Sequence, residues 1–291
     1  MKLMSFSRSL TAVCAAFAFS TQAAATAWQP VPQSQLAYVQ LEQGAVLLLL
    51  ADTFTPINTA QFRQLIRDGY YDGASFYRVI DQFVLQAGYL DGEKVPASVK
   101  RPTATKAEFS WPVPASSKYT LVQTPDLLAK ETGFRAGFAV GREGTQEWLV
   151  HCPNVVNFAR NEQADSASGD IAIMQGQAPR HLDRNMSVVA RVIWGHEALN
   201  AVRRGDKAQG GMLEQPTSRS RIVKMSIGSD LPVSQQIHLE MLDTHSEEFL
   251  LQLAKARKRE NAFYQYHGNG QLDVCYQQIP VRVQTTKPDK P

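Results

Sequence analysis

The sequence SFYRVIDQFVLQAG, residues 75–88, decides the fold. It consists of two apolar-rich segments on either side of Asp81-Gln82, which predicts two short antiparallel strands joined by a turn. Side chains on an extended segment alternate between faces, so we expect Phe76 and Arg78 on one face. Phe83 follows the turn and can return beside Arg78. The stretch therefore predicts a hairpin that presents an arginine next to aromatic side chains.

The sequence on either side of this hairpin predicts many short strands and few helices. A hairpin is expected over 36–41 and 45–50, and a helix that begins at Thr55-Pro56 follows it. One helix near each end of a set of short strands favours a β-barrel over an α/β sheet. The other expected elements are strands at 155–159, 170–174, 187–193 and 222–227 and a second helix at 197–204.

Residues 92–152 form a long insertion in this pattern. Four prolines between residues 92 and 119 exclude a long helix there, so loops with short strands are expected. Strands at 134–140 and 147–150, separated by the glycine-containing segment 141–144, predict another hairpin.

Residues 229–291 are predicted to form a C-terminal extension of strand, helix and hairpin. Thr244 and Glu247 match a capping box that would begin the helix, and Phe249 and Leu253 give it an apolar stripe. The hairpin is expected over 272–276 and 279–283, where apolar residues alternate. We expect this extension to pack on the barrel formed by residues 28–228.

The first 27 residues have the pattern of a signal peptide. Lys2 and Arg8 precede an apolar run at 10–19 that is too short to span a bilayer, and Ala25-Thr26-Ala27 fits a cleavage site. A buried N-terminal helix is the alternative, but the run lacks a polar face and a capping signal. Cys14 has a poor lipoprotein context, so no membrane anchor is expected after cleavage.

Charge and residue spacing exclude several classes of function. The chain has 30 Lys and Arg against 27 Asp and Glu, and the leader holds two of the basic residues. The nearly neutral mature chain gives no support for binding to nucleic acid or anionic membranes. The six histidines lack ligand spacing, so no metal is expected, and no G-x-S-x-G, H-E-x-x-H or C-x-x-C motif occurs.

Residues 75–88 resemble the cyclophilin family, whose members carry F-H-R-[VI]-I-x-x-F-[MV]-x-Q-G-G there. The resemblance extends over roughly residues 36–227 and is interrupted by 92–152. Weaker matches are the helix start at 56–62, the turn at 69–73, the acidic-aromatic element at 106–109, and 181–185 followed by 188–192.

The resemblance implies a mainly β fold, a closed antiparallel cyclophilin-like β-barrel with two flanking helices. It implies peptidyl-prolyl cis-trans isomerase activity on proline-containing polypeptides, without a cofactor. Arg78 would be the catalytic residue, while Phe83 and Gln86 would hold the proline ring and the substrate backbone. The family's remaining substrate-binding positions would be Val84, Ala159, Arg160, Ile171, Ile173, His181 and Leu182.

The proposed role of Arg78 agrees with the chemistry of the prolyl bond. Amide resonance imposes a rotational barrier of ~18–20 kcal/mol. The twisted transition state leaves a lone pair on the prolyl nitrogen, and a fixed guanidinium donor stabilises that state more than either planar isomer. A lone arginine beside aromatic rings is more often structural, so the assignment depends on the surrounding motif.

Several pocket positions depart from the family pattern. Arg160 replaces an asparagine, Ile171 a substrate-binding glutamine and Ile173 a phenylalanine of the proline pocket. These replacements leave a second hypothesis open, a catalytically weak cyclophilin-fold chaperone that binds peptides.

The mature chain keeps two cysteines, Cys152 and Cys275. Export to an oxidising compartment makes a disulfide between them one alternative, and two buried free thiols are the other. The leader and the bacterial character of the motif predict a periplasmic protein that assists the folding of exported proteins.

Overall fold

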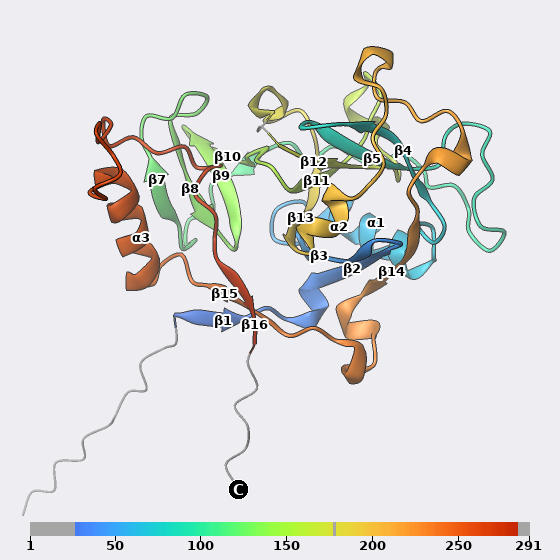
Figure 1. Ribbon diagram of the computed structural model, residues 1–291, viewed down its shortest axis with the longest axis horizontal. Helices are drawn as coiled ribbons and strands as arrows, with labels where there is room; N and C mark the ends of the chain where they lie inside the picture. Colours follow the sequence, from blue (N-terminus) through green and yellow to red (C-terminus); the bar gives the residue numbers. More distant parts are fainter. Residues whose placement is uncertain (1–26, 177–178, 285–291) are drawn as a thin grey trace, which may run out of the picture.

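The computed structural model describes residues 27–176 and 179–284, so the predicted signal peptide lies almost entirely outside the described residues. An eight-stranded antiparallel sheet with the order β14-β2-β3-β13-β11-β12-β5-β4 forms the larger body, on the right in Figure 1. Its strands are β2 (Leu36–Leu41), β3 (Gly44–Leu50), β4 (Ser75–Ile80), β5 (Val84–Gly88), β11 (Val155–Phe158), β12 (Ile171–Met174), β13 (Val188–Trp194) and β14 (Ile222–Ile227).

Backbone hydrogen bonds join the two edges of this sheet. Phe76 N–H donates to the Ser220 carbonyl at 3.0 Å, and Ile222 N–H donates to the Ala74 carbonyl at 2.8 Å. A bridge between Ser75 and Arg221 lies between these bonds. The contacts bring β4 and β14 together, and the sheet curls into the predicted barrel.

Two helices flank the barrel, as the sequence predicts. Helix α1 (Pro56–Arg67) buries Phe62, Leu65 and Ile66 in the barrel core, and the short α2 (His196–Asn200) buries Ala198 and Leu199. The predicted second helix was longer, reaching residue 204. The remaining helical turns are 3₁₀ helices at Gln33–Gln35, Ala164–Ser166, Arg180–Leu182, Lys207–Gln209, Pro216–Ser218, Gly228–Asp230 and Val233–Gln235.

Glu108, from the acidic-aromatic element, lies at the beginning of α1. Its carboxylate accepts hydrogen bonds from the backbone N–H groups of Ile57 and Asn58, at 3.2 and 2.8 Å. These are donors that a helix leaves without partners at its N-terminus, where negative charge is also favoured. Glu108, in the first part of the insertion, therefore stabilises the N-terminus of a helix that flanks the barrel.

The insertion forms a sheet of its own, with the order β6-β10-β9-β8-β7. It is drawn in green to the left of the barrel in Figure 1. Its strands are β6 (Trp111–Pro112), β7 (Thr120–Gln123), β8 (Glu131–Arg135), β9 (Phe138–Glu143) and β10 (Gln146–Leu149). The predicted strand over 134–140 is wrong, because Ala136 and Gly137 have positive φ and turn the chain between β8 and β9.

A buried carboxylate holds this second sheet together. Glu147 on β10 is completely buried and lies 2.6 Å from an Nη of Arg135 and 2.8 Å from an Nη of Arg142. Trp111 Nε1 also donates to it, at 2.9 Å. Two guanidinium groups and an indole satisfy the carboxylate oxygens, as a buried charge requires.

The C-terminal extension differs from its prediction in three respects. Strand β15 (Leu239–Leu242) lies between β1 (Trp28–Pro30) and β16 (Val281–Val283) in a three-stranded sheet, so residues 272–283 form no hairpin. Helix α3 (Glu247–Lys258) is capped by Ser246, whose hydroxyl accepts from Phe249 N–H, and not by Thr244. In Figure 1, α3 lies beside β7 and β8 of the insertion, away from the barrel.

Contacts with the insertion hold α3 in this position. Phe249 on α3 and Phe134 on β8 are both buried, and their ring centroids lie 5.6 Å apart. The guanidinium of Arg257 donates to the backbone carbonyl of Val122. Cys152 and Cys275 form a disulfide that joins the end of the insertion to the extension. No helix among the described residues is long and apolar enough to cross a membrane.

We expect Phe249→Ala to lower the free energy of unfolding by about 3–5 kcal/mol, because it removes a buried ring from the α3–insertion contact. Leu250→Ala is the matched control on the same helix, since Leu250 is 47% exposed, and should change stability by less than ~0.5 kcal/mol. Chemical denaturation measures both. Equal effects of the two variants would contradict the packing described for α3.

Candidate functional site

Arg78 and Gln86 face each other across the β4–β5 hairpin. They are register partners, and Arg78 Nη1 donates to Gln86 Oε1 at 2.6 Å. Arg78 Nε donates to the Gly210 carbonyl at 2.9 Å. Two of the guanidinium nitrogens are thus fixed by the barrel. Among the described residues no acceptor is paired with Nη2, which leaves donors for another group.

A β-bulge sets the direction of Arg78. The pairing of β4 with β5 shifts between Phe76 and Arg78, so the strand carries one extra residue there. Phe76 and Val79 consequently both lie in the barrel core, and Arg78 lies on the outer face with Gln86. The prediction that Phe76 shares a face with Arg78 is wrong, because simple alternation does not allow for the bulge.

The outer face around Arg78, called here the Arg78 face, extends over β5 and β12. Gln86 is paired with Ala172, and Val84 with Met174, and cross-strand partners share a face of a sheet. Val84 therefore lies on the Arg78 face. Phe83, at the turn that precedes β5, is half-buried, and its carbonyl accepts from Gln175 N–H at 2.8 Å.

Ile171 and Ile173 do not lie on the Arg78 face. Both are at most 2% exposed and pack in the barrel core with Leu85 and Ala87, their register partners. Side chains alternate along a strand, so an alignment shifted by one residue assigns the wrong face to every position. The two isoleucines are core residues. Ala172 and Met174, between and after them on β12, lie on the Arg78 face, and the family resemblance did not identify these two residues.

Ala159 and Arg160 follow β11, and both are half-buried. Ala159 N–H donates to the Asp170 carbonyl at 2.8 Å, which joins this segment to β12. Arg160 Nε and Nη1 donate to the carbonyls of Asn185 and Asn161, at 2.8 and 2.7 Å. The guanidinium thus holds its own loop together.

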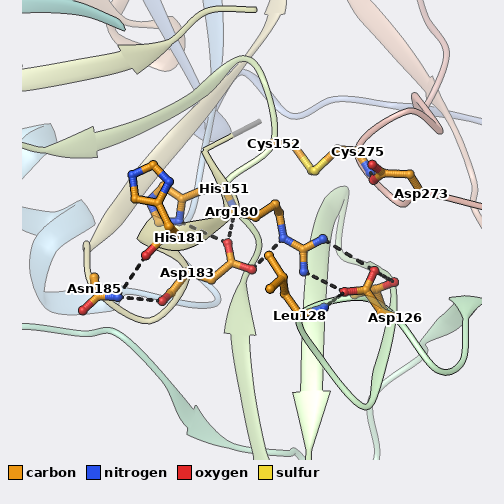
Figure 2. Close-up of polar contacts among 11 residues, drawn as sticks. Asp126, Leu128, His151, Cys152, Arg180, His181, Asp183, Asn185, Asp273 and Cys275 are labelled. Carbon is orange, nitrogen blue, oxygen red and sulfur yellow. Dashed lines mark hydrogen bonds and ion pairs between the residues drawn. A yellow bond between two sulfur atoms is a disulfide. The ribbon is translucent and has the colours of Figure 1, made fainter. Parts of the chain in front are cut away.

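His181 and Leu182 lie in the 3₁₀ helix Arg180–Leu182. His181 is exposed, and Leu182 packs against the apolar core between barrel and insertion. Figure 2 shows what fixes this turn: Arg180 lies between Asp183 of its own loop and Asp126 of the insertion, at 2.7 and 2.9 Å. The insertion is therefore bonded directly to a segment that the cyclophilin pattern assigns to substrate binding.

Asp183 completes this network. It accepts from His151 N–H at 2.8 Å in addition to its ion pair with Arg180. Burial raises the pKa of Asp183, but the hydrogen bonds from His151 and the charge of Arg180 outweigh it, and the pKa lies below the usual carboxyl value. The carboxylate therefore stays ionised and keeps the turn in place at neutral pH.

Asp170, directly before β12, is a polar residue to which the sequence pattern assigns no role. Its carboxylate accepts from the Tyr77 hydroxyl at 2.9 Å and lies directly over Gly88, where a Cβ would come within 2.0 Å of Oδ1. Burial raises its pKa, and the hydrogen bond from Tyr77 opposes this shift. The available signal in the sequence was the pair Gly169-Asp170 together with Gly88 on the neighbouring strand, because a glycine leaves room for a carboxylate beside it.

No cluster of side chains suited to a metal ion occurs in the part of the chain that the structure describes. The Arg78 face offers a guanidinium, an amide, small and apolar side chains, and no nucleophile beside a base. This arrangement suits hydrogen bonding to an amide and contact with an apolar ring.

Residues 36–227 match the family model for cyclophilin type peptidyl-prolyl cis-trans isomerases. The chain belongs to this family. A probable peptidyl-prolyl cis-trans isomerase of Brucella suis is 30% identical over 228 residues, which cover 78% of this chain and 99% of that protein. A peptidyl-prolyl cis-trans isomerase of Synechococcus elongatus is 40% identical over 52 residues, which cover 18% of this chain and 36% of that protein.

Among solved structures, cyclophilin AquaCyp293 from Hirschia baltica has the same fold with a TM-score of 0.70. The two chains are 24% identical, and the match covers 90% of this chain and 95% of that one. Because the family model ends at residue 227, this wider match shows that the similarity in fold extends beyond the cyclophilin barrel. The protein is a cyclophilin-type peptidyl-prolyl cis-trans isomerase with a barrel, an insertion sheet and a C-terminal extension.

Proposed function

We propose that Arg78 is the catalytic residue of this isomerase and that it stabilises the twisted prolyl amide. The single observation that carries the proposal is the fixed guanidinium: Nη1 is bonded to Gln86 and Nε to the Gly210 carbonyl. Its remaining N–H groups can donate to the pyramidal prolyl nitrogen. A donor that is already oriented needs no reorganisation when the amide twists.

The surrounding side chains support binding of the proline ring. The half-buried Phe83 offers apolar surface to the ring, and Val84 and Met174 belong to the buried cluster against which Phe83 packs. The exposed His181 and the half-buried Leu182 would contact the polypeptide beyond the proline. Gln86 would act as the positioning residue of Arg78.

The structure weakens the reason for the second hypothesis, a binding protein with little turnover. That hypothesis was based on Ile171 and Ile173 as replacements within the pocket, and both lie in the core. Ala172 is the register partner of Gln86 on the Arg78 face, and this small side chain leaves the guanidinium in place.

We expect Arg78→Ala to lower kcat/KM on a proline-containing peptide at least about 100-fold, the usual loss when a fixed transition-state donor is removed. Arg78→Lys should restore little, because an ammonium cannot hold Gln86 and Gly210 and also donate to the amide. Arg67→Ala is the control, since Arg67 is an exposed helical arginine paired with Asp230. Unchanged turnover in Arg78→Ala would rule out the mechanism.

We further propose that the protein acts on exported polypeptides in the periplasm. The leader pattern at 1–27 and the disulfide between Cys152 and Cys275 support this, because disulfides persist in oxidising compartments.

Expression in a Gram-negative host tests the proposed location. The periplasmic fraction should contain a chain that begins at Trp28, with no free thiol, by intact mass before and after alkylation. A cytoplasmic chain that retains residues 1–27 and three reactive thiols, that of Cys14 included, would show that the protein is not exported.

A further inference from the structure

A cavity of about 500 Å³ lies between the barrel, the insertion sheet and the C-terminal extension, away from Arg78. Strand β13 forms one wall, strands β9 and β10 form another, and residues 274–281 close the third side. The disulfide between Cys152 and Cys275 is part of the lining. Apolar side chains, including Phe138, Leu149 and Ile279, share the remaining lining with the polar side chains of Asn154, Gln277 and Gln278.

Among the described residues, one cationic side chain lines this cavity, that of Arg191 on β13. Its Nε is closed off from solvent and has no hydrogen-bond partner. The other described contacts of the guanidinium are the sulfur of Met241, 3.3 Å from Nη2, and the ring of Phe138, whose centroid lies 5.9 Å away. No carboxylate of the described residues forms an ion pair with it. The charge is thus surrounded by apolar groups and a weak acceptor.

Arg191 differs in this respect from the other enclosed arginines. Arg135, Arg142 and Arg180 each lie within 3 Å of at least one buried carboxylate. Arg191 is half-buried, and a charge held partly away from water without a counter-ion is unfavourable, so this burial lowers the pKa of Arg191 to about 10. An anion brought in by a ligand would supply the missing partner.

The remaining titratable side chains at the cavity do not supply this partner. Glu197 is exposed at the start of α2 and has no described ion pair with Arg191. Burial lowers the pKa of His196, and the charge of Arg191 lowers it further while Glu197 opposes the shift. The imidazole is therefore neutral at pH 7 and adds no competing charge.

We propose that this cavity binds a small monocarboxylate with an apolar body, whose carboxylate pairs with the guanidinium of Arg191. The volume lies in the range of sites for small ligands, which are mostly apolar with a few polar groups that fix orientation. The carboxylate would accept from the two Nη groups of Arg191, in the bidentate geometry that guanidinium groups favour, because Nε is closed off from solvent. The apolar body would lie against Phe138, Leu149 and the disulfide.

Titration calorimetry of the full mature chain with decanoate at pH 7 tests the proposal, with decan-1-ol as the uncharged probe of the same length. We expect decanoate to bind with a Kd below about 1 mM, and decan-1-ol to bind at least about 10-fold more weakly. This comparison uses the unaltered protein. Absence of decanoate binding, or equal affinity for the alcohol, would overturn the proposal.

Two variants locate the site. Arg191→Gln should weaken decanoate binding at least about 10-fold, with little effect on decan-1-ol. Glu197→Gln is the matched control at the mouth, where removal of an exposed like charge should leave affinity unchanged or raise it a few-fold. Peptide isomerisation by each variant serves as the check on folding, since neither residue lies on the Arg78 face. Equal decanoate affinity of Arg191→Gln and the unaltered protein would place the carboxylate elsewhere.

Discussion

The bulge in β4 between Phe76 and Arg78 is the constraint on which the candidate site depends. It lets Phe76 and Val79 both fill the barrel, while Arg78 points to the opposite side beside Gln86. A regular strand would turn either the arginine into the core or a core residue outward, and both changes are costly. The packing of the barrel and the orientation of the guanidinium are consequently two results of one local irregularity.

The sequence was sufficient for the elements of the barrel, because their apolar residues are regularly spaced and their turns carry strong local signals. The β2–β3 hairpin, α1 and the β4–β5 hairpin lie within one or two residues of their predicted bounds. The face of the sheet on which each side chain lies was harder to predict. Ile171 and Ile173 were assigned to substrate binding through an alignment, and a shift of one residue reverses the face of a whole strand.

The insertion and the extension were less predictable because each depends on the other. Ala136 and Gly137 turn the chain within a segment that looks like one strand, and Ser246, not Thr244, caps α3. The position of α3 is set by Phe134 and Val122 of the insertion, and the Cys152–Cys275 disulfide ties the insertion to the extension. Contacts between segments more than a hundred residues apart leave no local pattern. The Arg180–Asp126 ion pair then joins this second body to the segment that holds His181.

The central claim is that Gln86 acts through the orientation of Arg78, and a double-mutant cycle on kcat/KM tests it most directly. Gln86→Ala alone should lower kcat/KM less than Arg78→Ala does, because the bond to Gly210 still holds one side of the guanidinium. The double variant should be no slower than Arg78→Ala, since Gln86 has nothing left to position. Losses that multiply in the double variant, as for independent residues, would contradict the account.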